Sequence, residues 1–190
     1  MSVAARSREV VLALGSNLGD RLANLQAGVD ALTTGPEITA TAVSAVYETS
    51  PVGGPDQPDY LNAVMLAVSA LPARALLDRC HAAEHARGRV RTTRWGPRTL
   101  DIDIIACDAE TSNDPELTLP HPRARERAFV IVPWLDADPH GELPGFGPVA
   151  ELAARVGDSG IRRRDDLSLR IGHRRPGAAA RAQAPANRGG

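Results

Sequence analysis

Two aspartates separated by one residue are the first candidates for chemistry in this chain. Asp101 and Asp103 follow an arginine- and glycine-containing segment and stand in a run rich in isoleucine and leucine. If residues 100–107 form a strand, its alternation places both carboxylates on one face and Ile102 and Ile104 on the other. Mg²⁺ prefers oxygen ligands and is usually held by one or two carboxylates, water and the phosphates of its substrate. The spacing therefore predicts a magnesium site that serves a phosphorylated substrate.

Arginines close to the aspartates support this interpretation. The nearest are Arg89, Arg91, Arg94 and Arg98. A guanidinium group matches phosphate oxygens with two parallel hydrogen bonds, and a carboxylate pair can hold two metal ions that clamp an in-line displacement. The alternative is that the aspartates are only the solvent-facing side of an amphipathic strand. Aspartate is depleted in strands, so two on one face beside these arginines favour a site.

The composition narrows the chemistry further. All 22 residues counted as Lys plus Arg are arginine, so the chain contains no lysine. This excludes a P-loop lysine, a Schiff-base lysine and a lysine-attached cofactor. Arginine, histidine, backbone amides and metal must therefore supply any phosphate binding.

Cysteine content and hydropathy bear on the location of the protein. Cys80 and Cys107 are too few and too far apart in the sequence for a disulfide framework, which favours a reducing compartment. The first residues contain no apolar run of signal-peptide length, and no stretch of about 18 apolar residues occurs. We expect a cytoplasmic protein that does not enter a membrane.

Charge is unevenly distributed along the chain. Residues 1–159 carry 14 arginines against 21 acidic residues, whereas residues 160–190 carry eight arginines against two acidic residues. Because the second segment is also rich in alanine, proline and glycine, we expect a catalytic domain over residues 1–159 and a basic, disordered tail over residues 160–190. The acidic balance of the domain opposes a surface that follows a nucleic-acid backbone. A tail that contacts nucleic acid or an acidic partner is the alternative.

The spacing of apolar residues indicates which elements must position these side chains. The predicted strands are residues 9–14, 38–49, 60–69 and 100–107, and the predicted helices are residues 22–35, 72–87 and 123–135. Asn17 or Asp20 is expected to cap the first helix, and Pro133 to interrupt the last one. This order is typical of an α+β fold, a ferredoxin-like α/β sandwich with an antiparallel sheet and flanking helices.

Four motifs, taken in order, resemble those of the 6-hydroxymethyl-7,8-dihydropterin pyrophosphokinase family. They are residues 14–21 (Leu-Gly-Ser-Asn-Leu-Gly-Asp-Arg), Tyr47-Glu48-Thr49 with residues 56–62, Gly88-Arg89-Val90-Arg91 with residues 94–104, and Leu119-Pro120-His121-Pro122 with Arg127 and Phe129. The resemblance extends over about residues 9 to 140. It implies a monomeric enzyme that uses ATP and Mg²⁺ to place a diphosphate on the hydroxymethyl oxygen of the pterin. AMP is the other product, and the step belongs to folate biosynthesis.

The resemblance also implies roles for individual residues. Asp101 and Asp103 would hold two Mg²⁺ ions and, with Arg89 and Arg98, would be the catalytic residues. ATP would be bound by Glu84, Arg89, Arg91, Arg98, Ile104, His121 and Arg127. The pterin would be bound by Thr49, Val52, Tyr60, Asn62, Trp95 and Phe129, with Tyr60 and Phe129 stacked on the two faces of the ring.

The residue types suit these roles, although simpler interpretations of the same residues exist. A flat polar heterocycle is held well by aromatic faces together with in-plane donors and acceptors, and phosphoryl transfer depends on positioning and charge neutralisation. The alternatives are that Tyr60 and Phe129 are ordinary core rings, that His121 is a turn residue, and that Glu84 is a solvated charge on an exposed helix.

Three other functions are compatible with parts of the pattern. A glycosyltransferase can use an Asp-x-Asp pair, but this chain is short for that fold and lacks an evident parallel β-α-β half. A nucleic-acid-binding module would explain the arginines but not the acidic domain. A family member that binds pterin without turnover is disfavoured because the aspartates and arginines are all present.

Overall fold

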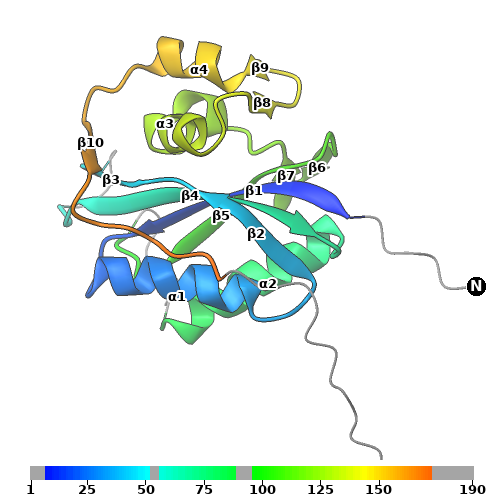
Figure 1. Cartoon of the computed structure of the whole chain (residues 1–190), viewed down its shortest axis with the longest axis horizontal. Coiled ribbons are helices and arrows are strands. Elements are labelled where there is room, and N and C mark those ends of the chain that lie inside the picture. Colours follow the sequence, from blue (N-terminus) through cyan, green and yellow to red (C-terminus); the bar gives the residue numbers. More distant parts are fainter. Residues whose placement is uncertain (1–6, 52–55, 89–95, 173–190) are drawn as a thin grey trace, which may run out of the picture.

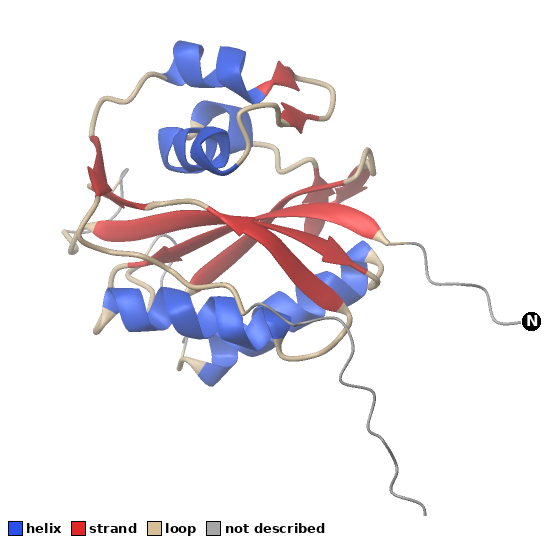
Figure 2. Ribbon diagram, viewed as in Figure 1, coloured by secondary structure: helices blue, strands red, loops and turns tan. Residues whose placement is uncertain are grey.

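An antiparallel sheet lies between two layers of helices, as Figures 1 and 2 show. The computed structural model describes residues 7–51, 56–88 and 96–172. Within them the sheet contains β1 (Arg8–Ser16), β2 (Ile38–Val43), β3 (Val46–Thr49), β4 (Tyr60–Ser69), β5 (Asp101–Cys107) and β10 (Ile161–Arg164). The strand order is β10-β3-β4-β1-β5, and β2 also pairs with β4. The expected α+β sandwich with an antiparallel sheet is confirmed.

The two longest strands form the centre of the sheet. β1 pairs with β4 from Arg8 opposite Ser69 to Ser16 opposite Leu61, and its other side pairs with β5. Every residue of β4 is buried or half-buried because helices cover both of its faces. This rigid centre supports the chain segments that lead into β4 and β5.

Helices α1 (Arg21–Thr33) and α2 (Ala73–Ala86) cover one face of the sheet. The side chain of Asp20 caps α1 by accepting a hydrogen bond from the backbone N–H of Ala23 at 3.0 Å. Of the two expected caps, Asp20 is therefore the correct one. The main hydrophobic core lies between these helices and the sheet and includes Leu12, Leu14, Leu25, Leu32 and Leu76.

Helices α3 (Ala128–Ala137) and α4 (Val149–Val156) cover the opposite face. The second core on this side surrounds the buried ring of Trp134. Pro133 lies inside α3 without ending it, so the expected interruption is wrong. The neighbours Val130, Ile131 and Trp134 are all buried, and this packing holds the helical path despite the hydrogen bond that proline lacks. Three short elements complete this region: a 3-10 turn η1 (Ala124–Glu126) and the hairpins β6 (Ser112–Asp114)–β7 (Leu117–Leu119) and β8 (Glu142–Leu143)–β9 (Gly147–Pro148).

The single strand expected over residues 38–49 is divided into β2 and β3, which both pair with β4. Ser44 lies at the division, where its hydroxyl accepts a hydrogen bond from the backbone N–H of Val64 at 3.0 Å. The next backbone N–H, of Ala45, donates to Asp136 of the α3 layer at 2.7 Å. These partners replace the ladder bonds that a continuous strand would make.

The boundary expected between a domain ending at residue 159 and a disordered tail is wrong for residues 161–172. Ile161 to Arg164 form β10, which pairs with β3. Beyond β10, Gln26 and Arg170 exchange two hydrogen bonds at 2.8 and 2.9 Å, and Leu169 is buried. The arginine-rich composition concealed an alternating apolar pattern at residues 167, 169 and 171. Residues 173–190 of the expected tail lie outside the described residues.

Within the described residues, no helix combines the length and the hydrophobicity needed to span a membrane.

Candidate active site

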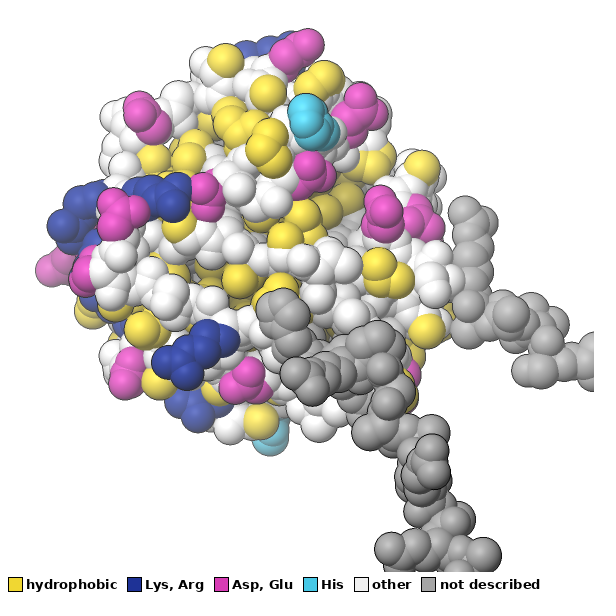
Figure 3. All heavy atoms as spheres, in the orientation of Figure 1, with side chains coloured by type: hydrophobic (Ala, Val, Ile, Leu, Met, Phe, Trp, Pro, Cys, Tyr) yellow, Lys and Arg dark blue, Asp and Glu magenta, His cyan; other side chains and the backbone are white. Residues whose placement is uncertain are grey.

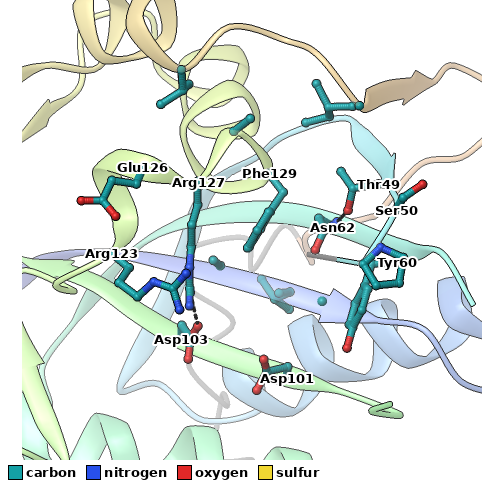
Figure 4. A pocket seen from close by; sticks show the side chains of 18 of the residues that line it. Thr49, Ser50, Tyr60, Asn62, Asp101, Asp103, Arg123, Glu126, Arg127 and Phe129 are labelled. Atoms are coloured by element: carbon teal, nitrogen blue, oxygen red, sulfur yellow. Dashed lines mark hydrogen bonds and ion pairs between the residues drawn. The ribbon is translucent and has the colours of Figure 1, made fainter. Parts of the chain in front are cut away.

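A pocket of about 640 Å³ lies where the ends of β1, β3, β4 and β5 meet the start of α3 (Figure 4). Eight residues expected at the site line it: Thr49, Tyr60, Asn62, Arg98, Asp101, Asp103, Arg127 and Phe129. Val52, Arg89, Arg91 and Trp95, which were also expected there, lie outside the described residues. Glu84, Ile104 and His121 are not part of the pocket lining.

The alternation of β5 works as the spacing predicts. Asp101 and Asp103 face the pocket, while Ile102 and Ile104 are buried in the core beneath α1 and α2. Arg98 forms an ion pair and a hydrogen bond with Asp101. The two carboxylates therefore face a pocket and not open solvent.

Asp103 sits among basic groups that come from the other side of the pocket. Its Oδ2 atom lies 3.3 Å from Nη1 of Arg127 and 3.8 Å from Nε2 of His121. Burial raises the pKa of Asp103 above its ordinary value, and the negative charge of Asp101 adds to this effect. The positive charges of Arg127 and Arg98 oppose this rise in the pKa of Asp103.

His121 is placed as a hydrogen-bond donor. Burial lowers the pKa of His121, although the charge of Asp103 acts in the opposite direction, so the imidazole is neutral at neutral pH. Its Nδ1 atom accepts a hydrogen bond from the backbone N–H of Arg123 at 3.2 Å. The proton of the neutral ring is therefore on Nε2, the atom that faces Asp103.

Asn17 connects the two chain segments that carry the site residues. Its Oδ1 accepts from the backbone N–H of Arg98 at 2.7 Å, and its own backbone N–H donates to the carbonyl of Arg98 at 3.0 Å. Its Nδ2 donates to Oε1 of Gln57 at 3.0 Å and to the carbonyl of Pro58 at 3.1 Å. Sequence reasoning treated Asn17 only as a possible helix cap and missed this role. The available signal was an amide side chain inside a glycine-rich turn between a strand and a helix.

Glu84 has a different place from the one expected. It is buried, and its Oε1 accepts a hydrogen bond from the backbone N–H of Ile102 at 2.8 Å. The alternative of a solvated charge is wrong, and the structure does not bring the side chain into the pocket. Glu84 instead holds β5 from the α2 side, at the residue between the two aspartates.

The other end of the pocket combines aromatic and polar side chains. Nδ2 of Asn62 donates to Oγ1 of Thr49 at 2.8 Å, and the hydroxyl of Tyr60 donates to Gln57 at 3.3 Å. In Figure 4, Thr49 and Asn62 lie between Phe129 on α3 and Tyr60 on β4. Tyr60 and Phe129 are half-buried and line the pocket, so they are not simply core rings.

Close approach at this end requires a glycine. Gly15 lies opposite Asn62 in the β1–β4 pairing, and a Cβ atom at residue 15 would be 3.2 Å from Oδ1 of Asn62. The glycine therefore leaves the amide room to face the pocket.

A family model described as 7,8-dihydro-6-hydroxymethylpterin-pyrophosphokinase matches residues 11–139. The chain belongs to this pyrophosphokinase family. A relative from Mycobacterium leprae is 49% identical over 159 residues, which cover 77% of this chain and 78% of the relative. A relative from Mycobacterium tuberculosis strain H37Rv is 44% identical over 160 residues, which cover 77% of this chain and 83% of the relative. Both are named 2-amino-4-hydroxy-6-hydroxymethyldihydropteridine pyrophosphokinase.

Solved structures of the family support the fold. A Plasmodium falciparum HPPK-DHPS triple mutant with SDX-DHP superposes with a TM-score of 0.66 at 12% identity, and the match covers 85% of this chain. This chain spans 48% of that longer protein. At such low identity the similarity shows the α+β fold alone. The pocket lining also includes residues to which the sequence analysis assigned no role, among them Ser50, Gln57, Arg123, Glu126, Val156, Ser159, Gly160 and Ile161.

Proposed function

We propose that this protein transfers the pyrophosphoryl group of ATP to the hydroxymethyl oxygen of 6-hydroxymethyl-7,8-dihydropterin and releases AMP. The observation that carries this proposal is the composition of one pocket. Two carboxylates with arginines stand at one end, and two aromatic side chains with an amide and a hydroxyl stand at the other. The names of the related proteins agree with this division into a phosphate end and a pterin end.

Asp101 and Asp103 have the chemistry to hold magnesium. Their carboxylates are hard oxygen donors on one strand face, and within the described residues no third His, Cys, Asp or Glu completes a metal cluster. This fits an ion that takes one or two carboxylates and leaves its other positions to water and substrate phosphates. Magnesium bound there, as two ions in our proposal, would neutralise the charge of the ATP phosphates.

Arg98, Arg127 and His121 would bind the phosphates of ATP from two sides of the aspartates. The arginine side chains line the pocket and pair with the carboxylates. Each guanidinium has further N–H groups beyond the one in its ion pair, and phosphate oxygens are suitable acceptors for them. The neutral Nε2–H of His121 adds a donor without adding charge.

The pterin ring would lie between Tyr60 and Phe129. Asn62 and Thr49 would supply hydrogen bonds to the polar edge of the ring, since their side chains line the same end of the pocket and already bond to each other. Such an arrangement fixes the hydroxymethyl group relative to the phosphate end, and fixing two reactants in one geometry supplies much of the acceleration in phosphoryl transfer. Val52, Trp95, Arg89 and Arg91 remain part of the proposal on the sequence resemblance alone.

The test is nucleotide analysis of the purified protein incubated with ATP. We expect AMP to form only when both 6-hydroxymethyl-7,8-dihydropterin and Mg²⁺ are present, and chelation of the metal to stop it. Formation of ADP would indicate an ordinary kinase. AMP formation that does not depend on the pterin would contradict the proposal.

A further inference from the structure

The carboxyl-terminal part of the chain forms a wall of the pocket. Val156, Ser159, Gly160 and Ile161 all line it, although the family model matches only residues 11–139. The pocket is therefore completed by a segment that lies outside the matched region. Among these four residues, Ile161 has the largest side chain, and that side chain is apolar. Because Ile161 lies on a strand, the sheet sets the direction of its side chain.

Ile161 belongs to a row of side chains that crosses three strands. It lies opposite Thr49 in the β10–β3 pairing, and Thr49 lies opposite Tyr60 in the β3–β4 pairing. Directly opposed residues in antiparallel strands present their side chains on the same face. Because Thr49 and Tyr60 line the pterin end of the pocket, Ile161 lies on that same face beside them.

Ion pairs hold β10 in place on both of its faces. On the α1 side, Glu48 pairs with Arg162 and with Arg164 at 3.1 Å, and also with Arg21 at 2.9 Å. On the α3 side, Arg163 pairs with Asp136 at 2.6 Å. Figure 3 shows basic and acidic side chains gathered together over β10. These ion pairs fix the strand on both of its faces.

We propose that Ile161 is a substrate-contacting residue that determines affinity and selectivity for the pterin. This inference rests on the proposed function. The other side chains in its row, Thr49 and Tyr60, carry hydroxyls, whereas Ile161 offers a branched hydrocarbon surface with no hydrogen-bonding group. It would pack against the flat bicyclic ring beside Thr49 and keep water from that part of the ring.

Steady-state kinetics of Ile161 variants test the proposal, with Ile161→Ala as the first. Removing most of the side chain takes away part of one apolar contact, so we expect the KM for the pterin to rise about tenfold. The KM for ATP and the kcat are expected to change by less than about twofold. Ile161→Val and Ile161→Thr form a matched pair because they have the same shape and differ by one hydroxyl. The threonine variant is expected to have the higher KM for the pterin.

Arg163→Ala is the control for a loosened strand, since it removes the pair with Asp136 while leaving the pocket lining intact. It is expected to leave the KM for the pterin unchanged. Three results for the KM for the pterin would each overturn the inference. They are an equal increase in Arg163→Ala and Ile161→Ala, equal values in Ile161→Val and Ile161→Thr, and an unchanged value in Ile161→Ala. Wild-type protein that forms no AMP with the pterin would instead refute the proposed function, and the inference would fall with it.

Discussion

At the scale of single residues, the paired carboxylates of β5 are balanced by charges that come from different parts of the chain. Asp101 pairs with Arg98, three residues earlier, and Asp103 pairs with Arg127, which follows it. Two like charges on one strand face would repel each other without these partners. The same basic groups and carboxylates are suited to share the phosphates and metal of a nucleotide.

Replacing either aspartate by alanine is expected to remove activity while sparing the fold. Under the proposed function each aspartate holds metal, so its loss should lower the rate of AMP formation by about a hundredfold or more. Neither side chain belongs to the hydrophobic core, so we expect the midpoint of thermal unfolding, followed by circular dichroism, to move by only a few degrees. Asp78→Ala, an exposed acid on α2, is the matched control and should be fully active. Normal turnover in a folded Asp101→Ala variant would contradict the metal assignment.

Asn17 is expected to be important for both stability and substrate binding. Asn17→Ala removes three side-chain hydrogen bonds of a buried amide, which should lower the free energy of unfolding by about 2–3 kcal/mol. Because the amide joins the segments before β4 and β5, the KM values for ATP and for the pterin should both rise. Asn17→Asp keeps the acceptor for Arg98 but loses the donors to Gln57 and Pro58. The KM for the pterin should therefore rise more than the KM for ATP. Equal increases in the two KM values would contradict the role of Asn17 in joining the two segments.

At the scale of elements, the local spacing of apolar residues predicted most of the strands and helices. It missed the elements whose stability depends on residues far away in the sequence. The strand over residues 60–69 matches β4 at both ends, and β5 begins one residue after the expected start. These strands are long and rich in apolar residues, so periodicity defines them. β10 was missed because three of its four residues are arginine. Its arginines pair with Glu48, more than 100 residues earlier in the chain, and no local window of sequence contains both partners.

The position of Glu84 shows that prediction from local sequence has the same limit at the candidate site. Strand alternation predicts that Asp101 and Asp103 share a face, because that depends only on neighbouring residues. The hydrogen bond from Ile102 to Glu84 depends on how α2 packs beneath β5. An acidic residue on a helix gives no sequence signal of such burial.

The attachment of β10 is expected to depend on pH through Glu48. Burial alone would raise the pKa of Glu48, but hydrogen bonds from Arg162 and Arg21 and the charge of Arg164 outweigh it, so the pKa lies below its usual value. The contribution to stability is therefore complete above the unfolded-state pKa of about 4.3 and is lost as pH falls through the folded-state value.

The matched variant is Glu48→Gln, which keeps the shape and removes the charge. At pH 7 the free energy of unfolding of this variant should be lower than that of wild type by about 1 kcal/mol. The difference is small because Arg162 is exposed and solvent screens its ion pair with Glu48. Denaturant unfolding at a series of pH values should show this difference shrinking below about pH 4. A difference that stays constant down to pH 3 would show that the ion pairs do not hold the strand.

At the scale of the whole molecule, the pocket joins residues from nearly the full length of the described chain, from Ala13 in β1 to Ile161 in β10. Figures 1 and 2 show the chain after α4 returning to the sheet edge at β3 and then crossing α1. This return contacts both helical layers, through Asp136 of α3 and Gln26 of α1. The carboxyl-terminal segment therefore ties the two layers together beside the pocket.

Truncation tests this role. A chain that ends at Gly160 loses β10 and the buried Leu169, and we expect its thermal unfolding midpoint to fall by about 10 °C or more. A chain that ends at Gly172 keeps all of these contacts and is the control, with an expected midpoint close to that of the full chain. Similar midpoints for the two truncated chains would show that residues 161–172 do not contribute to the stability of the fold.

The central claim is that both terminal phosphates of ATP move together to the pterin. Phosphorus NMR of the products from ATP, 6-hydroxymethyl-7,8-dihydropterin and Mg²⁺ tests it most directly. The account predicts equal amounts of AMP and a pterin that carries a diphosphate ester, and neither product with the Asp101→Ala variant. ADP together with a pterin monophosphate, or AMP together with free pyrophosphate and unmodified pterin, would contradict it.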